Sequence, residues 1–388
     1  MNKIYFDHNA TTPVLDEVFE AMVPFLKEQW GNPSSIHWAG RGTRKAVEDA
    51  RESVARLLNC TPLEIIFTSS GTEGDNHAIK GLAYAKKDKG NHIITTKVEH
   101  PAVLNTCKHL QKDGFDVTYL DVDTDGLIDL NALKSAITPR TILITVMFAN
   151  NETGVLSPIK EIGDIAKEKG VTFHTDAVQA AGKIPIDLQK LNIDLLTISG
   201  HKLYGPKGVG ALFARRGVRL VPLIHGGHHE RNRRGGTENV AGIVGFGKAC
   251  DIALKDMDRE ITHLKALRER LEKGIAEKIP HIKVNGHLEK RLPNTANISF
   301  EFVEGESLLL NLDMKGIAAS SGSACTSGSL EPSHVLLAMS LSHELSHGSV
   351  RFSLGKSNTA GEIDYLIEIM PPIVERMRSM SPLYAAAK

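Results

Sequence analysis

The chain of 388 residues carries 46 lysines and arginines against 46 aspartates and glutamates, so its formal net charge is zero. This balance, without long runs of like charge, argues against nucleic-acid binding and favours a small molecule or a protein as the partner. No run of about 18 apolar residues occurs and the N-terminus has no signal-peptide stretch, so we expect a soluble, cytoplasmic protein that does not bind a membrane.

Four cysteines, Cys60, Cys107, Cys250 and Cys325, lie far apart and form no C-x-x-C pair. Their spacing fits neither a disulfide framework nor a cysteine zinc site, so we expect four free thiols. Cys325 differs from the others because it lies in a serine- and glycine-rich loop, SSGSACTSGS (320–329). The other three have apolar, helix-like surroundings.

The N-terminal stretch TTPVLDEVFEAMVPFLKE predicts a helix with Thr12 as its N-cap and Pro13 as its first helical residue. A second amphipathic helix is expected in GTRKAVEDARESVARLL. Between residue 64 and about residue 215, β-branched runs alternate with helical patterns such as IKEIGDIAKEKG. The runs are EIIFT, HIITT, VTYLDV, TILITVMF, VTFHTD, DLLTIS and VGALFA. This rhythm predicts crossover units around a mostly parallel sheet, with ligands bound beyond the carboxyl ends of the strands.

A long helix is expected in ITHLKALRERLEKGIAEKI, followed by short strands, the loop around Cys325, the strand SVRFSLG and a last helix. A chain of this length is expected to divide into a larger and a smaller domain. We place the boundary near residue 260, where this helix is expected to begin. The large domain is then 13–259, and the small domain is 1–12 with 260–388.

Two residues that directly follow strands suggest a cofactor. Lys202 follows DLLTIS in the glycine-rich segment GHKLYGPKG, and a desolvated lysine in such a place readily forms a Schiff base. Asp176 ends VTFHTD and is suited to keep a pyridine nitrogen protonated, which makes an electron sink. These are the requirements of pyridoxal phosphate.

An anion site for the cofactor phosphate is expected in SSGTEGDNHAIK, where small residues follow EIIFT and open a helix. Thr72 adds a hydroxyl there. Ser199 and His201 flank the lysine where they can bind the same phosphate.

Two further residues allow two interpretations each. His100 is either a histidine with satisfied hydrogen bonds beside a helix start, or an imidazole that stacks on the cofactor ring and moves protons. Asn151 is either a turn residue or a donor to the ring oxygen of the cofactor.

The whole set of motifs resembles the cysteine desulfurases. The motifs are VEH (98–100), TDAVQ (175–179), SGHKLYGPKG (199–208), RRGGTENV (233–240), SSGSACTSG (320–328) and RFSLG (351–355). The match begins at YFDHNATTP and covers most of the chain. NNETG and SSGSACTSGSLEPSHVL resemble the long-loop class, which includes the nitrogenase-associated and housekeeping iron–sulfur enzymes.

The resemblance implies a homodimeric α/β protein, a fold-type-I transferase dependent on pyridoxal phosphate, with a mostly parallel seven-stranded sheet in its large domain and a smaller α+β domain. Lys202 would carry the cofactor, Asp176 would pair with its ring nitrogen and Gln179 with its ring oxygen. The other implied roles are phosphate binding by Gly71, Thr72, Ser199 and His201, phosphate binding in the partner subunit's site by Thr237, substrate carboxylate binding by Asn151 and Arg351, and nucleophilic attack by Cys325.

The implied reaction removes sulfur from L-cysteine, which gives L-alanine and a persulfide on Cys325, with His100 managing protons. The sulfur would pass to an acceptor, by resemblance an iron–sulfur scaffold protein, and Cys325 could transiently bind a nascent cluster as a metal ligand. A serine- and glycine-rich segment suits a thiol that must travel between two sites.

Three alternatives are open. A selenocysteine lyase or a related class-V aminotransferase would share Lys202, Asp176 and His100, although an aminotransferase has no need of Cys325. HELSH (343–347) fits the H-E-x-x-H pattern of zinc hydrolases, with Glu368 as a possible third ligand. Gly348 and a strand-like SVRFSL follow at once, which favours a loop or a single helical turn over the long helix that such a site needs.

Overall fold

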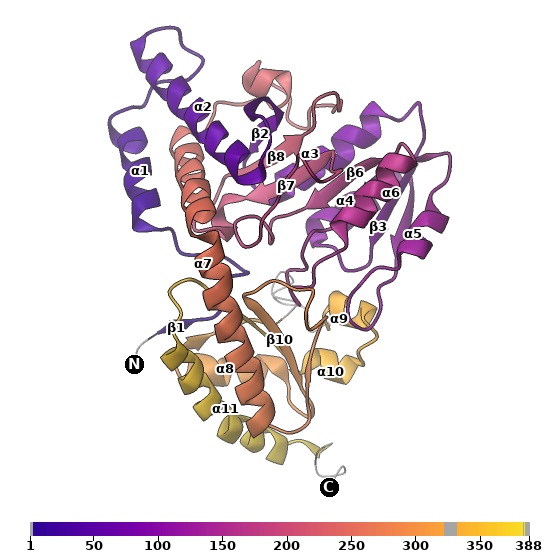
Figure 1. The fold of residues 1–388 in the computed structure, drawn as a ribbon, viewed down its shortest axis with the longest axis vertical. Coiled ribbons are helices and arrows are strands. Elements are labelled where there is room, and N and C mark those ends of the chain that lie inside the picture. Colours follow the sequence, from indigo (N-terminus) through magenta and orange to yellow (C-terminus); the bar gives the residue numbers. More distant parts are fainter. Residues whose placement is uncertain (1–2, 322–331, 383, 385–388) are drawn as a thin grey trace.

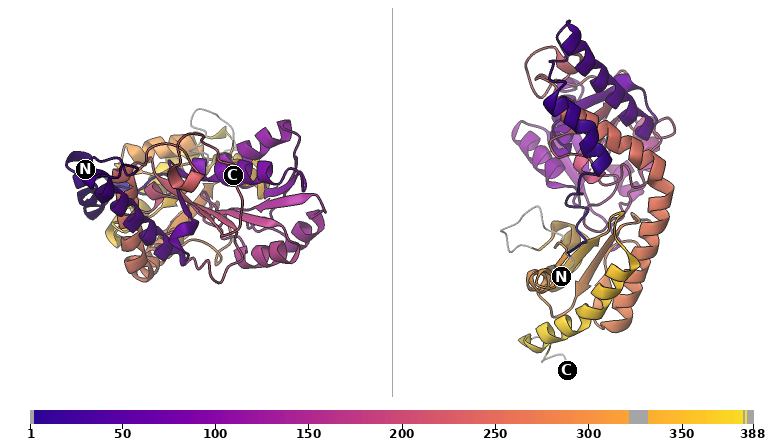
Figure 2. Two further views of the ribbon diagram at one scale, coloured as in Figure 1. Left: turned by 90° about the horizontal axis from the view of Figure 1, so that it is seen from above. Right: turned by 90° about the vertical axis from the view of Figure 1, so that its left-hand side faces the viewer.

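The computed structural model describes residues 3–321, 332–382 and 384. A larger α/β part and a smaller part lie along one long helix, α7 (Val240–Lys278) (Figure 1). The view from the side shows α7 running the length of the molecule, with the two parts one above the other (Figure 2). No helix among the described residues is both long and apolar enough to cross a bilayer.

The large part is built on a seven-stranded sheet with the order β2-β8-β7-β6-β5-β3-β4. Neighbouring strands are parallel except at β8, which is antiparallel to both β2 and β7. The strands are β2 (Ile65–Thr68), β3 (His92–Thr96), β4 (Asp116–Leu120), β5 (Thr141–Thr145), β6 (Thr172–Asp176), β7 (Leu195–Ser199) and β8 (Gly210–Ala214). Each overlaps one of the apolar runs found in the sequence, and the expected fold class is confirmed.

Both faces of this sheet are buried. Successive side chains of a strand point to opposite faces, so Ile65 and Phe67 of β2 join one apolar cluster while Ile66 joins another. Burial on both sides explains why these strands read as continuous apolar runs rather than alternating ones. The helices of this part are α1 (Asp16–Lys27), α2 (Trp38–Leu58), α3 (Gly71–Ala85), α4 (Pro101–Lys112), α5 (Leu130–Ala136) and α6 (Ile159–Glu168). Short 3-10 turns are η1 (Pro62–Glu64), η2 (Gly200–Lys202) and η3 (His229–Asn232).

The small part has its own apolar cluster between two small sheets and the C-terminal half of α7. One sheet is antiparallel with the order β12-β10-β9, and in the other β1 pairs with β11 in parallel. Its strands are β1 (Ile4–Tyr5), β9 (Ile282–Val284), β10 (Thr295–Phe300), β11 (Ile317–Ala318) and β12 (Ser349–Ser353). Its other helices are α8 (Gly305–Asp313), α9 (His334–Ala338), α10 (His343–His347) and α11 (Ala360–Ser379).

Two helix starts differ from the sequence prediction. Helix α1 begins at Asp16 with Leu15 as its cap, because the Thr12 hydroxyl is used elsewhere: it donates to the His201 carbonyl (3.1 Å) and accepts from the Tyr204 amide (2.7 Å). Helix α7 begins at Val240, about twenty residues before the predicted start. Its first turns are glycine-rich, which lowers helix propensity, and Gly247 is needed because a Cβ there would lie 2.7 Å from Ala50. The division of the chain near residue 260 stays a prediction.

The N-terminal segment joins the two parts. Strand β1 pairs with β11, and the next residue, Phe6, is fully buried in the small-part cluster. The chain then crosses to the large part, where the Thr12 amide donates to the His201 carbonyl at 2.9 Å. Residues 7–12 are therefore fixed at both ends, and we call them the N-terminal strap.

Phe6→Ala should destabilise the small part. Removing a fully buried phenyl ring leaves a cavity, and the expected loss in free energy of unfolding is about 3–5 kcal/mol. Urea denaturation followed by tryptophan fluorescence and circular dichroism measures it. The control Leu310→Ala, on the exposed face of α8, should change the value by less than about 0.5 kcal/mol. Equal effects of the two substitutions would contradict this packing.

Candidate active site

A cavity of about 390 Å³ lies where the carboxyl ends of the parallel strands meet the N-terminal strap and β12. Most of the residues singled out in the sequence line it, although they come from five separate strand ends and a distant strand. These are Gly71, Thr72, His100, Asn151, Asp176, Gln179, Ser199, His201, Lys202 and Arg351. The fold therefore brings the predicted residues together, and the role of each stays a prediction.

Lys202 sits in η2, directly after β7 ends at Ser199. Its Nζ donates to the carbonyl oxygens of Asn9 and Ala10, both at 2.6 Å. The strap thus fixes the position of the amine at the cavity wall.

Asp176, at the end of β6, is buried, and its Oδ1 accepts a hydrogen bond from the Val178 amide at 2.9 Å. Burial raises the pKa of Asp176 to about 6, while Lys202 acts in the opposite direction. Asp75 also lines the cavity, and burial together with the Asp176 charge raises the pKa of Asp75 well above its usual range. A cationic partner placed here would therefore favour the ionised form of Asp176.

The start of α3 has the features expected of an anion site. Ser70 caps the helix by accepting from the Glu73 amide at 3.1 Å, and Gly71 and Thr72 of the first turn line the cavity. A Cβ on Gly71 would lie 2.7 Å from Val178 Cγ2, so only glycine fits. Ser199 Oγ is buried and has no hydrogen-bond partner within the described ranges. Helix amides and an unsatisfied hydroxyl suit a phosphate.

His100 caps α4, as its first interpretation expected, and it also lines the cavity. Its role toward the cofactor stays a prediction. Its Nδ1 accepts from the Ala102 amide at 3.1 Å, so the neutral ring carries its proton on Nε2. Burial, followed by the charges of Lys202 and His334, lowers the pKa of His100 to about 4. His201, whose Nδ1 lies 3.2 Å from the Thr11 hydroxyl, has its pKa lowered to about 4 by burial as well. Both rings are neutral near pH 7.

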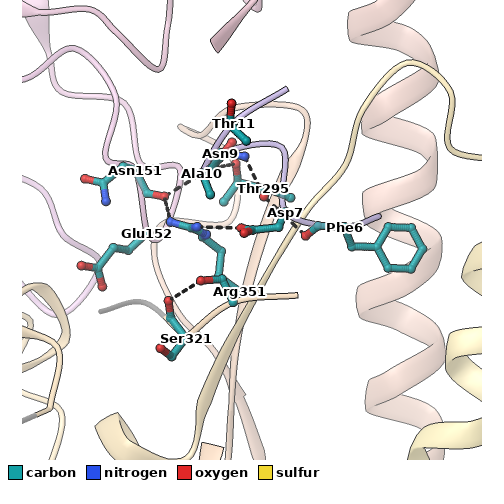
Figure 3. Close-up of polar contacts among 12 residues, drawn as sticks. Phe6, Asp7, Asn9, Ala10, Thr11, Asn151, Glu152, Thr295, Ser321 and Arg351 are labelled. Carbon is teal, nitrogen blue, oxygen red and sulfur yellow. Dashed lines mark hydrogen bonds and ion pairs between the residues drawn. The ribbon is translucent and has the colours of Figure 1, made fainter. Parts of the chain in front are cut away.

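Arg351, on β12, is buried beside the cavity (Figure 3). Its Nη1 donates to the Asn151 carbonyl at 2.9 Å, and its Nη2 contacts Asp7 Oδ1 at 2.8 Å. Nε has no partner in the described part of the chain. The guanidinium is therefore held rigidly while a donor remains for a ligand.

Asn9 is the residue that the sequence analysis missed. Its side-chain Nδ2 donates to the Asn151 carbonyl (3.2 Å) and to Thr295 Oγ1 (2.9 Å) (Figure 3). Its own carbonyl accepts from Gln179 Nε2 (2.9 Å) as well as from Lys202. The motif YFDHNATTP contained the only signal, but its partners lie 142 or more residues away.

Cys325 falls within residues 322–331, outside the described residues, so its role as nucleophile or cluster ligand stays a prediction. The flanking residues are anchored beside the cavity. Ser320 and Arg351 exchange two backbone hydrogen bonds (3.2 and 2.6 Å). On the other side, Ser333 Oγ donates to the buried Glu152 carboxylate at 2.5 Å, and His334 Nε2 lies 3.0 Å from the Glu99 carbonyl.

Two other sequence features lie apart from this cavity. Thr237 lines a separate hollow of about 110 Å³ together with Ser69 and Gly236. HELSH forms α10, a single five-residue turn that ends at Gly348 before β12, as the sequence favoured. In the described part of the chain no group of three histidine, cysteine or acidic side chains could hold a metal ion, so the geometry does not support the zinc alternative.

Comparisons with known proteins identify the family. The class-V aminotransferase model matches residues 4–366. The chain is 56% identical to a cysteine desulfurase IscS of Clostridium botulinum, over 99% of this chain and 98% of the relative. The chain belongs to the cysteine desulfurases. A cysteine desulfurase of Nostoc sp. is 56% identical over 98% of this chain and 95% of the relative. A solved structure of a NifS-like protein superposes with a TM-score of 0.91 and 40% identity, over 97% of this chain and all of the other.

Membership confirms the resemblance seen in the sequence, and it confirms pyridoxal phosphate as the cofactor. The cavity of this chain fits that group. Lysine and aspartate lie at its wall, and the unsatisfied Ser199 hydroxyl lies at the anion site of α3.

The protonation of His100 can be measured directly. In the cofactor-free protein its ring signals, observed by NMR with labelled histidine and assigned with His100→Gln, should not shift between about pH 5.5 and 8, because its pKa is about 4. In urea the same ring should titrate near about 6.5. Since the unfolded state binds the proton first, stability associated with this group is present above about pH 6.5 and declines as the pH falls toward 4. A folded-state midpoint above pH 6 would contradict this environment.

Proposed function

We propose that this desulfurase uses pyridoxal phosphate to take sulfur from L-cysteine, and that Cys325 receives it as a persulfide while L-alanine leaves. The observation that carries the proposal is the convergence of Lys202, Asp176, the α3 anion site and Arg351 on one cavity. Both ends of the segment that contains Cys325 are anchored at the same cavity.

Different residues at the cavity wall would bind different parts of the cofactor. Lys202 would hold it covalently, Asp176 would hold its ring nitrogen, and Gln179 would face its ring oxygen. Gly71, Thr72, Ser199 and His201 would bind its phosphate. When bound, the cofactor supplies an electron sink for charge that develops at the substrate Cα.

Arg351 and Asn151 are the proposed anchors of the substrate carboxylate. Its two contacts with Asp7 and Asn151 fix the guanidinium, and its Nε–H has no partner among the described residues. A held carboxylate fixes the substrate Cα near Lys202, whose amine would move the Cα proton. The Nε2–H of His100 would serve as a second proton donor or acceptor.

The other cysteines are poor nucleophiles. Burial raises the pKa of Cys60 and of Cys107 to about 12, and it raises the pKa of Cys250 well above its usual range. None of the three lines the cavity. Because the thiolate is the reactive form, the geometry of the described cysteines leaves Cys325 as the candidate.

In the proposed transfer, sulfur moves from the substrate to Cys325. The Cys325 thiolate forms a bond to the substrate sulfur, and the substrate carbon–sulfur bond breaks. Its electron pair stays with the carbon fragment, which takes up a proton and leaves as alanine. The second sulfur remains on Cys325 and requires an acceptor thiol or scaffold to remove it.

An iron–sulfur scaffold protein is the proposed acceptor, supported by relatives described as cysteine desulfurase IscS.

A homodimer is also proposed. Large apolar side chains project from α1, from the start of α2 and from the connection between them, at one end of the molecule (Figure 1). Those more than half exposed are Phe19, Leu26, Trp30, Ile36 and Trp38. Thr237, outside the cavity of its own chain, would then contribute to the partner subunit's site. Free thiols suit the cytoplasm.

Two single substitutions test cofactor attachment and sulfur acceptance separately. Lys202→Ala should abolish the borohydride-sensitive visible band, since the covalent link to the cofactor is lost. Cys325→Ala should keep the band and still bind L-cysteine, but alanine formation should fall by at least about a hundredfold because no nucleophile remains. Absorbance and alanine assays measure these effects. Cys60→Ala is the matched control and should retain activity; native sulfide release by the Cys325 variant would refute the nucleophile assignment.

Arg351→Lys tests the carboxylate anchor. Lysine keeps the charge but loses the forked geometry, so KM for L-cysteine should rise at least about tenfold, the loss of one charge-assisted hydrogen bond. The visible band should persist. Arg270→Lys, on exposed α7, is the control and should leave KM unchanged. An unchanged KM in both variants would show that the carboxylate binds elsewhere.

A further inference from the structure

Lys183 is a second lysine at the edge of the site, and the proposed reaction gives it no role. Its Nζ donates to Gln179 Oε1 at 2.7 Å and to Asn9 Oδ1 at 3.2 Å. Asn9 also binds Lys202, through its backbone carbonyl. The two lysines are therefore bound to opposite ends of the same residue.

The contacts of Gln179 select one orientation of its amide. As an ammonium, Lys183 has only donors, so the atom facing it is the amide oxygen. The Asn9 carbonyl is only an acceptor, so the atom facing it at 2.9 Å must be the amide nitrogen. With one N–H bound to Asn9, the second N–H of Gln179 is available to the cavity that Gln179 lines. A reversed amide would lose both hydrogen bonds.

We propose that Lys183 is a positioning residue, which fixes the Gln179 amide so that an N–H, and not the carbonyl oxygen, faces the cofactor ring oxygen beside Lys202. This inference rests on the proposed function, because it requires the cofactor to occupy the cavity. An N–H donor there stabilises the ionised ring oxygen and disfavours a proton on the nitrogen that joins Lys202 to the cofactor. An acceptor in its place would have the opposite effect.

The surroundings of Lys183 disfavour its ammonium form. Burial, together with the charges of Lys202 and Arg351, lowers the pKa of Lys183 well below its usual range. A neutral amine keeps N–H groups that can donate to Gln179, and the Asn9 carbonyl still selects the same amide orientation. The titratable and charged groups that face this region are Lys202, Arg351, His8, His201, Glu260 and Lys356.

The experiment follows the visible band of the holoenzyme during a pH titration. Lys183→Met removes the donor, so the apparent pKa of the band should rise by about one unit. Lys183→Gln retains an amide donor of similar length, so its band should titrate within about 0.3 units of the unmodified enzyme. If methionine disturbs folding, Lys183→Ser provides the same loss of contact with a small polar side chain. Lys190→Met, at an exposed lysine nearby, is the control and should have no effect.

A double-mutant comparison tests whether Lys183 acts through Gln179. Gln179→Ala alone should raise the apparent pKa, and adding Lys183→Met should raise it no further, because residues that act as a unit are not additive. Additive shifts would overturn the proposal, as would equal shifts in Lys183→Met and Lys183→Gln, or no shift in either. If the unmodified protein lacked a Lys202-dependent band, the proposed function itself would fail, which distinguishes the two results.

Discussion

The carbonyl oxygen of Asn9 accepts hydrogen bonds from Lys202 and Gln179, and its side chain reaches Asn151 and Thr295. These partners belong to the end of β7, the loop after β6, the loop after β5, and β10 of the small part. Asn9 is buried, so each of its polar groups must be paired within the protein. Asn9 thereby holds the Lys202 amine and the Asn151 carbonyl that accepts from Arg351. Through Thr295 it also joins the large part to the small part. Displacing the strap would disturb all three together.

Burial around the cavity shifts the pKa values of its histidines and carboxyl groups. His100 and His201 are kept neutral, whereas the buried carboxyls Glu99 and Glu152 have pKa values raised to about 8 and about 7. Arg351 forms an ion pair with Asp7 at 2.8 Å beside the cavity. The arginine and the helix amides at this cavity suit an anionic ligand. The cavity also provides uncharged groups for proton transfer near neutral pH.

The strands and most of the cavity could be predicted because their signals are local. Each strand is a short apolar run, and the polar residue that ends it points to the same edge of the sheet, so Lys202, Asp176 and His100 could be placed together without a structure. The positions of Asn9 and Lys183 at the site could not be predicted, because their contacts are with residues that only the fold brings near. Thr12 shows the same limit. A threonine before proline predicts a helix start, but the Thr12 hydroxyl instead donates to the carbonyl of His201, which lies far away in the sequence. The glycine-rich start of α7 was missed since its helix is stabilised by close packing rather than by propensity.

The central claim is that sulfur passes from L-cysteine to Cys325 at this cavity. The most direct measurement is mass spectrometry of the holoenzyme after one turnover with L-cysteine in the absence of an acceptor thiol. The account predicts one additional sulfur atom on the peptide that contains Cys325, formed together with one alanine per site. Alanine formed with the extra sulfur on Cys60, Cys107 or Cys250, or with all sulfur released as free sulfide, would contradict it.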